Sequence, residues 1–242
     1  MSFPSVDTLQ CYPNCYILPF DSPTYLDMNN TIEPLKIAIL LFDNYTALDV
    51  VGPYEVLSKI PNSKIYMAAV KRGLYKDMKG LHIWADFSLK EIGEPDILVI
   101  PGGFGIDALL DNQEIISWIQ QAHITSKWTV SVCSGALLLG AAGILTNCKA
   151  TTHWNRKEQL AKYGVTVENE RYVEDGKIIT SAGVSAGIDM LLYLLSLVVN
   201  EDYAKAVQLG MEYDPKPPFD SGSPEKAPKE IVDKIRQSNT TK

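Results

Sequence analysis

Short runs of apolar residues alternate along the chain with segments that have helical spacing. Residues 37–42 (IAILLF), 65–70, 96–100 and 129–132 have the length and composition of strands that are buried on both faces. The segments with helical spacing are 48–60, 106–123, 134–143, 158–163, 185–199 and 202–213. Weaker strand signals lie at 165–167, 171–173 and 178–180, with a small hairpin within 78–89. This alternation predicts an α/β three-layer sandwich, with a mainly parallel sheet and helices on both faces.

The two ends of the chain lack this alternation. Residues 1–34 contain several prolines and no clear periodicity, which predicts an irregular N-terminal arm. The α/β domain is expected over 35–224. Residues 225–242 are polar and predict a loosely attached C-terminal tail, with one helical turn around Ile231.

Charge and hydrophobicity restrict the partners of the protein. The net charge is −7, so neither nucleic acid nor an anionic membrane surface would attract the chain. The apolar run at 190–199 is too short to span a bilayer. Nucleic acid and membranes are therefore not expected partners. For the enzyme that the candidate residues below suggest, a small-molecule substrate is expected.

The opening segment predicts a cytoplasmic protein, and this location bears on the cysteines. The first basic residue is Lys36, so the opening segment resembles neither a signal peptide nor a mitochondrial presequence. In a reducing compartment no disulfides are expected. Cys11 and Cys15 have no matching pair of ligands downstream, and the three histidines are scattered, so no metal site is expected.

Cys133 is the first candidate for chemistry. It lies between the strand predicted at 129–132 and the helix that follows, and Gly135 allows a tight turn there. This is the pattern of a nucleophile elbow with sulfur in place of oxygen. The N-terminus of the helix is expected to stabilise a thiolate and to lower the pKa of Cys133.

Two further features fall at the same sheet edge, because ligands bind at the carboxyl ends of parallel strands. Gly102 and Gly103 follow one strand, and their free amide groups, with that of Ser134, would form an oxyanion-type pocket. Asp49 follows the first strand and would exchange a proton with the substrate beside the sulfur.

Each of these residues also has a structural interpretation. Cys133 could be an ordinary core residue, the glycines could serve tight turns, and Asp49 could cap a helix. His153 could form a Cys–His pair for proton transfer or stand in the pocket wall. The candidates for pocket walls are Trp84, Phe104 and Trp154.

Several motifs together resemble the ThiJ/PfpI superfamily, which has the class I glutamine amidotransferase-like fold. The motifs are PGG at 101–103 and VCSGA at 132–136. Within that superfamily the chain is most similar to the isonitrile hydratase (cyclohexyl-isocyanide hydratase) branch. The segments that carry this similarity are LDVVGP at 48–53, VCSGALLLGAAGIL at 132–145, ATTHW at 150–154, SAGID at 185–189 and MEYDPKPPFDSGSP at 211–224.

The resemblance implies a hydro-lyase in which Cys133 is the nucleophile and Asp49 the acid–base partner. Sulfur would add to the isocyanide carbon to give a thioimidate, and water would then release an N-substituted formamide, without a cofactor. The resemblance also implies a homodimer. Ser134 stands where this branch usually has Thr, and the absence of His directly after the cysteine argues against a protease.

Other functions are compatible with the same scaffold. A glyoxalase or deglycase would use the thiolate on an aldehyde, although those relatives tend to have Glu where Asp49 stands. A non-catalytic redox or ligand sensor would only need a reactive Cys133. A transcription regulator is disfavoured, because 18 residues after Pro224 are too few for a helix-turn-helix region.

Overall fold

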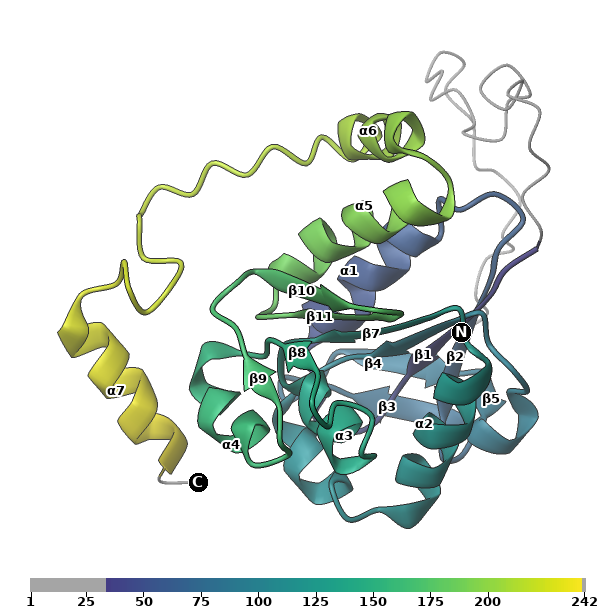
Figure 1. Cartoon of the computed structure of the whole chain (residues 1–242), viewed down its shortest axis with the longest axis horizontal. Coiled ribbons are helices and arrows are strands. Elements are labelled where there is room, and N and C mark those ends of the chain that lie inside the picture. Colours follow the sequence, from purple (N-terminus) through teal and green to yellow (C-terminus); the bar gives the residue numbers. More distant parts are fainter. Residues whose placement is uncertain (1–33, 241–242) are drawn as a thin grey trace, which may run out of the picture. The chain divides into compact units, whose positions relative to one another are not determined.

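The computed structural model describes residues 34–240, so the predicted N-terminal arm, with Cys11 and Cys15, lies outside the described residues apart from Pro34. A seven-stranded sheet forms the centre (Figure 1). Its spatial order is β10 (Tyr172–Asp175), β11 (Ile178–Ser181), β7 (Trp128–Val132), β6 (Ile97–Ile100), β1 (Lys36–Leu40), β2 (Lys64–Ala69) and β5 (Phe87–Ser88). All neighbouring pairs are parallel except β10 with β11, which is antiparallel.

The central strands are apolar because both faces of the sheet are covered. Every residue of β6 and four of the five residues of β1 are buried. A strand with one solvated face would instead alternate apolar and polar side chains. The predicted α/β three-layer fold is therefore confirmed.

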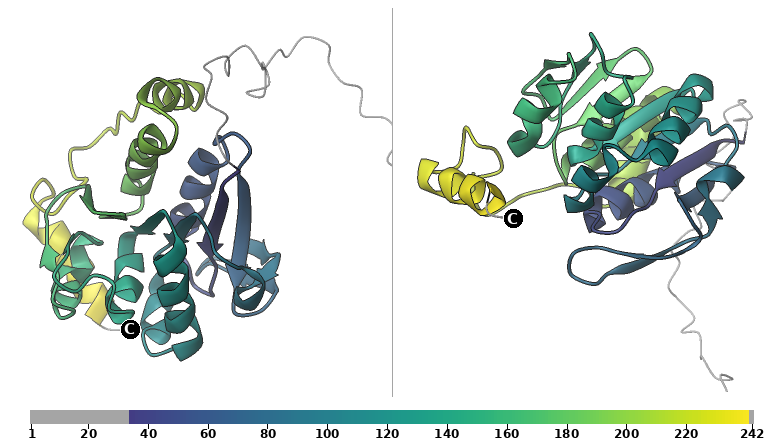
Figure 2. Two further views of the ribbon diagram at one scale, coloured as in Figure 1. Left: turned by 45° about the vertical axis from the view of Figure 1, so that its right-hand side comes forward. Right: turned by 90° about the horizontal axis from the view of Figure 1, so that it is seen from below.

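Helices lie on both faces of this sheet, as the views in Figures 1 and 2 show. On one face α1 (Ala47–Leu57) packs against α5 (Ala186–Val198), which also contacts α6 (Glu201–Gly210). The other face is covered by α2 (Gln113–Thr125) and α3 (Ala136–Ala141), and α4 (Lys157–Ala161) packs on α3. The short 3-10 helices are η2 (Leu89–Glu91), η3 (Phe104–Leu109), η4 (Cys133–Gly135) and η5 (Trp154–Arg156). None of the helices within residues 34–240 is both long and apolar enough to cross a membrane.

Two small sheets accompany the central one. β3 (Gly73–Lys76) and β4 (His82–Ala85) form an antiparallel hairpin, which begins earlier in the chain than the hairpin predicted within 78–89. β8 (Lys149–Ala150) and β9 (Thr166–Val167) form a short parallel pair.

The single helix predicted over 106–123 was wrong, since the structure has η3 followed by α2. The break occurs at Asn112, whose side-chain Oδ1 accepts hydrogen bonds from the amide groups of Glu114 and Ile115 at 3.1 and 3.2 Å. This side-chain cap starts a new helix, because it satisfies amide groups that have no partner within the helix.

The C-terminal tail was predicted with one helical turn, and the structure has a helix of 12 residues there, α7 (Lys229–Thr240). Ile231, Val232 and Ile235 place apolar side chains on neighbouring positions of this helix, and Val232 is buried. Lys229 and Asp233 form an ion pair one turn apart, which supports a helix with few apolar residues.

The order of the strands reverses between β1 and β6. The chain runs outward from β1 to β2 in one direction and from β6 through β7 to β11 in the other. In open α/β sheets, ligands bind at such a switch point, outside the carboxyl ends of the strands.

Candidate active site

The three features expected at one sheet edge do meet there. Asp49 follows β1, Gly102 follows β6 and Cys133 follows β7, and these strands are adjacent in the sheet. Gly102 links the other two residues, because its amide donates a hydrogen bond to Asp49 and its Cα atom lies against the Ser134 amide group, next to Cys133.

Cys133 stands at a sharp turn from β7 into η4. Its φ of 57° lies in the left-handed region, which is uncommon for a residue with a side chain. Gly135 allows the turn to press against the neighbouring strand, because a Cβ atom at this position would lie 2.1 Å from the carbonyl oxygen of Ile100. The carbonyl oxygen of Cys133 accepts hydrogen bonds from the Thr152 hydroxyl at 2.7 Å and the His153 amide at 3.4 Å. Packing and hydrogen bonds therefore hold the turn in its strained conformation.

Asp49 lies in the first turn of α1, and its side chain is completely buried. The residue at the N-cap is Thr46, so the capping role considered for Asp49 does not apply. Its Oδ2 atom accepts a hydrogen bond from the Gly102 amide at 3.1 Å. Its Oδ1 atom is buried and has no hydrogen-bond partner among the described residues, while the carboxyl group and the Cys133 thiol each shift the pKa of the other.

Burial decides the ionisation of this pair. Desolvation raises the pKa of Asp49 to about 7, against the lowering effects of the Cys133 thiol and the Gly102 amide. Burial, followed by the negative charge of Asp49, also raises the pKa of Cys133. The prediction of a lowered Cys133 pKa was therefore wrong, because desolvation and a neighbouring carboxylate outweigh the amide of Ser134.

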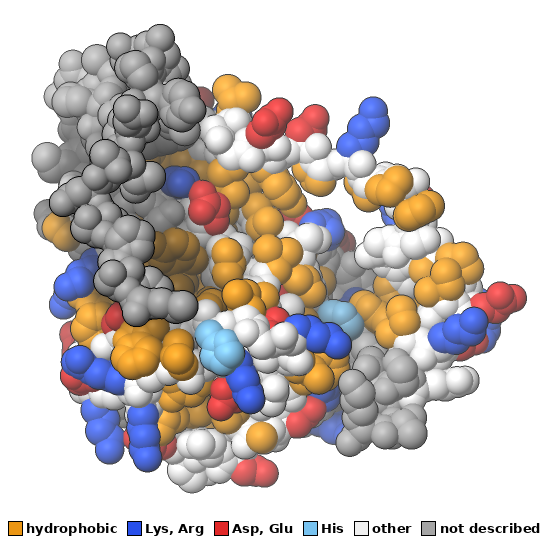
Figure 3. Space-filling model, turned by 180° about the vertical axis from the view of Figure 1, so that it is seen from behind, with side chains coloured by type: hydrophobic (Ala, Val, Ile, Leu, Met, Phe, Trp, Pro, Cys, Tyr) orange, Lys and Arg blue, Asp and Glu red, His pale blue; other side chains and the backbone are white. Residues whose placement is uncertain are grey.

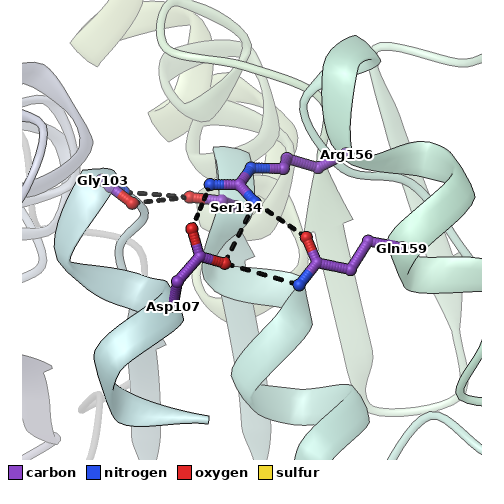
Figure 4. A network of polar contacts seen from close by, with 5 residues as sticks. All are labelled: Gly103, Asp107, Ser134, Arg156 and Gln159. Atoms are coloured by element: carbon purple, nitrogen blue, oxygen red, sulfur yellow. Dashed lines mark hydrogen bonds and ion pairs between the residues drawn. The ribbon is translucent and has the colours of Figure 1, made fainter. Parts of the chain in front are cut away.

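The amide groups of Gly102 and Gly103 are not free, contrary to the prediction. The Gly102 amide donates to Asp49, and the Gly103 amide donates to the Ser134 hydroxyl at 3.0 Å. That hydroxyl contacts the Gly103 carbonyl oxygen at 3.2 Å, as Figure 4 shows. In this arrangement the two glycines position Asp49 and Ser134, and they do not present amide groups to a substrate.

Cys133 and Ser134 line a cavity of about 810 Å³. Its apolar walls include Met78, Phe104, Trp154 and Val184. Its polar and small lining residues are Thr46, Gly103, Asp107, His153, Asn155, Arg156, Glu158, Gln159 and Arg236. Phe104 and Trp154 were predicted as walls, whereas Trp84 is not among the lining residues and is more than half exposed on β4. A volume of this order is typical of small-molecule sites.

His153 lies in the wall of this cavity. Its Nδ1 atom accepts the amide of Asn155 at 3.4 Å, which leaves the proton of the neutral ring on Nε2. Burial and the charge of Arg156 lower the pKa of His153, which favours the neutral ring. A role of His153 in proton transfer stays a prediction.

Sequence reasoning missed a polar network at the cavity. Arg156 forms two hydrogen bonds with the Asp107 carboxylate, at 3.0 and 2.6 Å, and a third with Gln159 at 2.8 Å (Figure 4). The network joins η3 to η5 and α4 across the cavity. No sequence signal points to it, because Asp107 and Arg156 are 49 positions apart and neither belongs to a periodic pattern.

Among the residues that the structure describes, no three His, Cys, Asp or Glu side chains are grouped as a metal site would require.

Comparison with known proteins agrees with this architecture. The DJ-1/PfpI family profile matches residues 35–197, and the chain belongs to this family. It is 36% identical to an isonitrile hydratase of Pseudomonas putida over 203 residues, which cover 84% of this chain and 89% of the relative. A deglycase of Pyrococcus horikoshii is 26% identical, over 61% of this chain and 89% of that protein.

A solved structure covers nearly the whole chain. The crystal structure of a ThiJ/PfpI family protein from Pseudomonas syringae has a TM-score of 0.86 and 31% identity, over 94% of both chains. The fold and the family are thus established together.

Proposed function

We propose that the protein is an isonitrile hydratase, which adds water to an isocyanide to give an N-substituted formamide. The observation that carries this proposal is the proximity of the buried Asp49 carboxyl group to Cys133, which lines the cavity and whose pKa Asp49 affects. An isocyanide carbon accepts a nucleophile and a proton at the same atom, so it requires a thiol and an acid–base group side by side. The 36% identity to a named isonitrile hydratase supports the same reaction.

In the first half of the reaction, sulfur and a proton add to the isocyanide carbon. With the raised pKa of Cys133, the resting sulfur keeps its proton near neutral pH. Asp49 takes this proton as the carbon–sulfur bond forms and gives it to the same carbon. The product is a thioimidate, R–N=CH–S–Cys133, in which every atom of the thiol and the isocyanide is retained.

In the second half, water replaces sulfur. Asp49 accepts one proton from water as the water oxygen adds to the thioimidate carbon, and passes this proton to the nitrogen. The carbon–sulfur bond then breaks, the remaining hydroxyl proton moves through Asp49 to the sulfur, and R–NH–CHO leaves. Asp49 ends in its starting state, so neither an oxidant nor a cofactor enters the balance.

The test is turnover of cyclohexyl isocyanide by the purified protein, with N-cyclohexylformamide measured as the product. Cys133→Ala is expected to abolish turnover. The matched control is Cys148→Ala, because Cys148 is a partly buried cysteine that is not among the residues lining the cavity. Normal turnover by Cys133→Ala would disprove the thioimidate route.

A second candidate is a deglycase or glyoxalase reaction, since one relative is a named deglycase. There the sulfur would add to an aldehyde carbon, and the resulting oxyanion would need hydrogen-bond donors. The amide groups of Gly102 and Gly103 already have partners, which favours the isocyanide reaction. Turnover of methylglyoxal without turnover of isocyanide would reverse this choice. Oxidation of Cys133 by peroxide, without turnover of either substrate, would indicate a sensor.

We further propose that the protein is a homodimer in the cytoplasm. Hydrophobic side chains are exposed on the face seen in Figure 3. On α1, Leu48, Val51 and Tyr54 are each about 40% exposed at a spacing of three residues, which is the pattern of a partner-facing helix. Light scattering after size-exclusion chromatography distinguishes a dimer from a monomer. A cytoplasmic location would keep the Cys133 thiol reduced.

A further inference from the structure

The C-terminal helix α7 reaches the candidate active site. A long connection after α6 carries α7 to the side of the domain where α4 lies (Figure 1). The guanidinium carbon of Arg236, on α7, lies 5.7 Å from the ring centroid of Trp154, within the range of a cation–π interaction. Arg236 and Trp154 both line the cavity above Cys133.

Other interactions link the connection after α6 to the domain. At the start of the connection the Tyr213 hydroxyl donates a 2.7 Å hydrogen bond to Asp189 of α5. Further on, Glu225 interacts electrostatically with Lys157 of α4. Val232 of α7 is only 8% exposed. The connection is therefore linked to the domain before α7, and on α7 itself the Arg236 guanidinium contacts the cavity wall.

Trp154 links this segment to the substrate cavity. Cys133 lines the same cavity as the apolar residues Met78, Phe104, Trp154 and Val184, so the substituent of an isocyanide bound at the sulfur would lie against these apolar walls. Of these, Trp154 is the wall that Arg236 covers. Loss of the cation would release the indole ring and open this side of the cavity. A large substituent would then lose contact area, whereas a small one near the sulfur would not.

We propose that Arg236 is a specificity-determining residue, which fixes Trp154 as a cavity wall and so favours isocyanides with bulky apolar substituents. This inference rests on the proposed function for its substrate class. It also extends the site beyond the α/β domain, because the wall is completed by a helix that follows residue 224.

The kinetic test compares cyclohexyl isocyanide with methyl isocyanide. Arg236→Gln is expected to raise KM for the cyclohexyl compound about two- to fivefold, as a cation–π contact of this kind predicts, with kcat unchanged. KM for methyl isocyanide is expected to stay at the wild-type value. Arg236→Lys keeps the cation and is expected to retain most of the preference. Lys234→Gln removes a charge from an exposed position on the same helix and serves as the matched control.

A second measurement does not require turnover. The rates of alkylation of Cys133 by iodoacetamide and by the larger N-phenylmaleimide are followed by mass spectrometry of the Cys133 peptide. Arg236→Gln is expected to accelerate the reaction with the larger reagent and leave the rate with iodoacetamide unchanged. If the wild-type protein hydrates neither isocyanide, the proposed function fails. The comparison of the two alkylation rates still tests whether Arg236 fixes Trp154 as a cavity wall.

The inference is overturned if Arg236→Gln leaves both the KM ratio and the reagent ratio at their wild-type values. It is also overturned if Lys234→Gln changes them equally, since the effect would then come from the net charge of α7. An equal change in KM for both isocyanides would exclude a role in size selection.

Discussion

The hydroxyl group of Thr152 donates a 2.7 Å hydrogen bond to the main-chain carbonyl oxygen of Cys133. Thr152 is fully buried, and its hydroxyl fixes the carbonyl group of Cys133, the residue with the left-handed φ of 57°. A strained turn of this kind persists only when its surroundings fix it. The hydrogen bond therefore couples the segment after β8 to the direction in which the Cys133 sulfur points.

This relationship predicts the effect of removing the hydroxyl. Thr152→Val keeps the shape of the side chain but leaves the Cys133 carbonyl with one donor fewer, so kcat is expected to fall roughly tenfold and stability by about 1 kcal/mol. Thr152→Ser retains the donor and is expected to restore most of kcat. Steady-state kinetics and urea unfolding measure the two effects.

The control for this change is Thr151→Val. The Thr151 hydroxyl is also buried, but it donates to the Glu168 carbonyl and not to Cys133. The Thr151→Val variant is expected to lose a similar amount of stability, while its kcat stays near the wild-type value. Equal losses of kcat in the two valine variants would show that the Thr152 hydroxyl has no specific effect on the turn.

The raised pKa of Asp49 predicts a pH-dependent penalty on stability. Below about pH 3 the carboxyl group is largely protonated in both the folded and the unfolded states. As the pH rises, the unfolded chain ionises first, with an ordinary pKa near 3.8, while the folded protein keeps the proton until about pH 7. Stability is therefore lost between these values, by roughly 4 kcal/mol at most, and the loss is complete above pH 7.

Asp49→Asn removes this penalty. The variant is expected to match the wild type in stability at about pH 3 and to exceed it by a few kcal/mol at pH 8. Other carboxyl groups have a pKa shifted in the opposite direction, such as Glu91, whose pKa is lowered to about 2 by its hydrogen bond with Arg72. These groups are the same in both proteins, so the difference in stability reports on Asp49 alone. Denaturant unfolding at several pH values measures the difference. A constant difference from pH 4 to pH 8 would contradict a folded-state pKa near 7.

The same pair predicts how the Cys133 thiol responds to Asp49. The negative charge of Asp49 contributes to the raised pKa of Cys133, after burial. Asp49→Asn removes the charge, so the thiol pKa falls and alkylation by iodoacetamide at pH 8 is expected to accelerate. Turnover is expected to be lost in the same variant, because the amide cannot carry a proton to carbon. Slower alkylation would mean that Asp49 acts as a base for the thiol in the resting protein.

The fold was predictable because its signals are local. The apolar runs of β1, β6 and β7 predict strands that are buried on both faces. Their alternation with helices is compatible with only a few topologies. The convergence of Asp49, Gly102 and Cys133 followed from a general property of parallel sheets, namely that the carboxyl ends of the strands meet at one edge.

Features that depend on packing were not predictable. The direction of the Cys133 pKa was wrong because a helix terminus is visible in the sequence, whereas the burial of Asp49 beside the sulfur is not. Only one turn of α7 was predicted, because its few apolar residues give a weak signal, although Val232 is buried. The contact of Arg236 with Trp154 joins positions 82 residues apart and has no signature in either segment.

Gly102 provides a last test of the site, because its lack of a side chain makes room for Asp49 and Ser134. A Cβ atom there would lie 2.6 Å from the Ser134 amide nitrogen, 2.8 Å from the Ser134 hydroxyl oxygen and 2.9 Å from Asp49 Oδ2. Two of these atoms are side-chain oxygens, but the nearest is main chain, so the clash cannot be relieved by a rotamer change alone. Gly102→Ala is therefore expected to displace the turn at Cys133 and to reduce kcat at least tenfold, with a loss of stability of about 1–3 kcal/mol. Gly93→Ala is the matched control, since a Cβ atom there meets nothing within 4 Å and the backbone is not in the left-handed region. Near-normal turnover by Gly102→Ala would mean that the spacing between Asp49 and Cys133 tolerates displacement, and the proton transfer proposed between them would have to be abandoned.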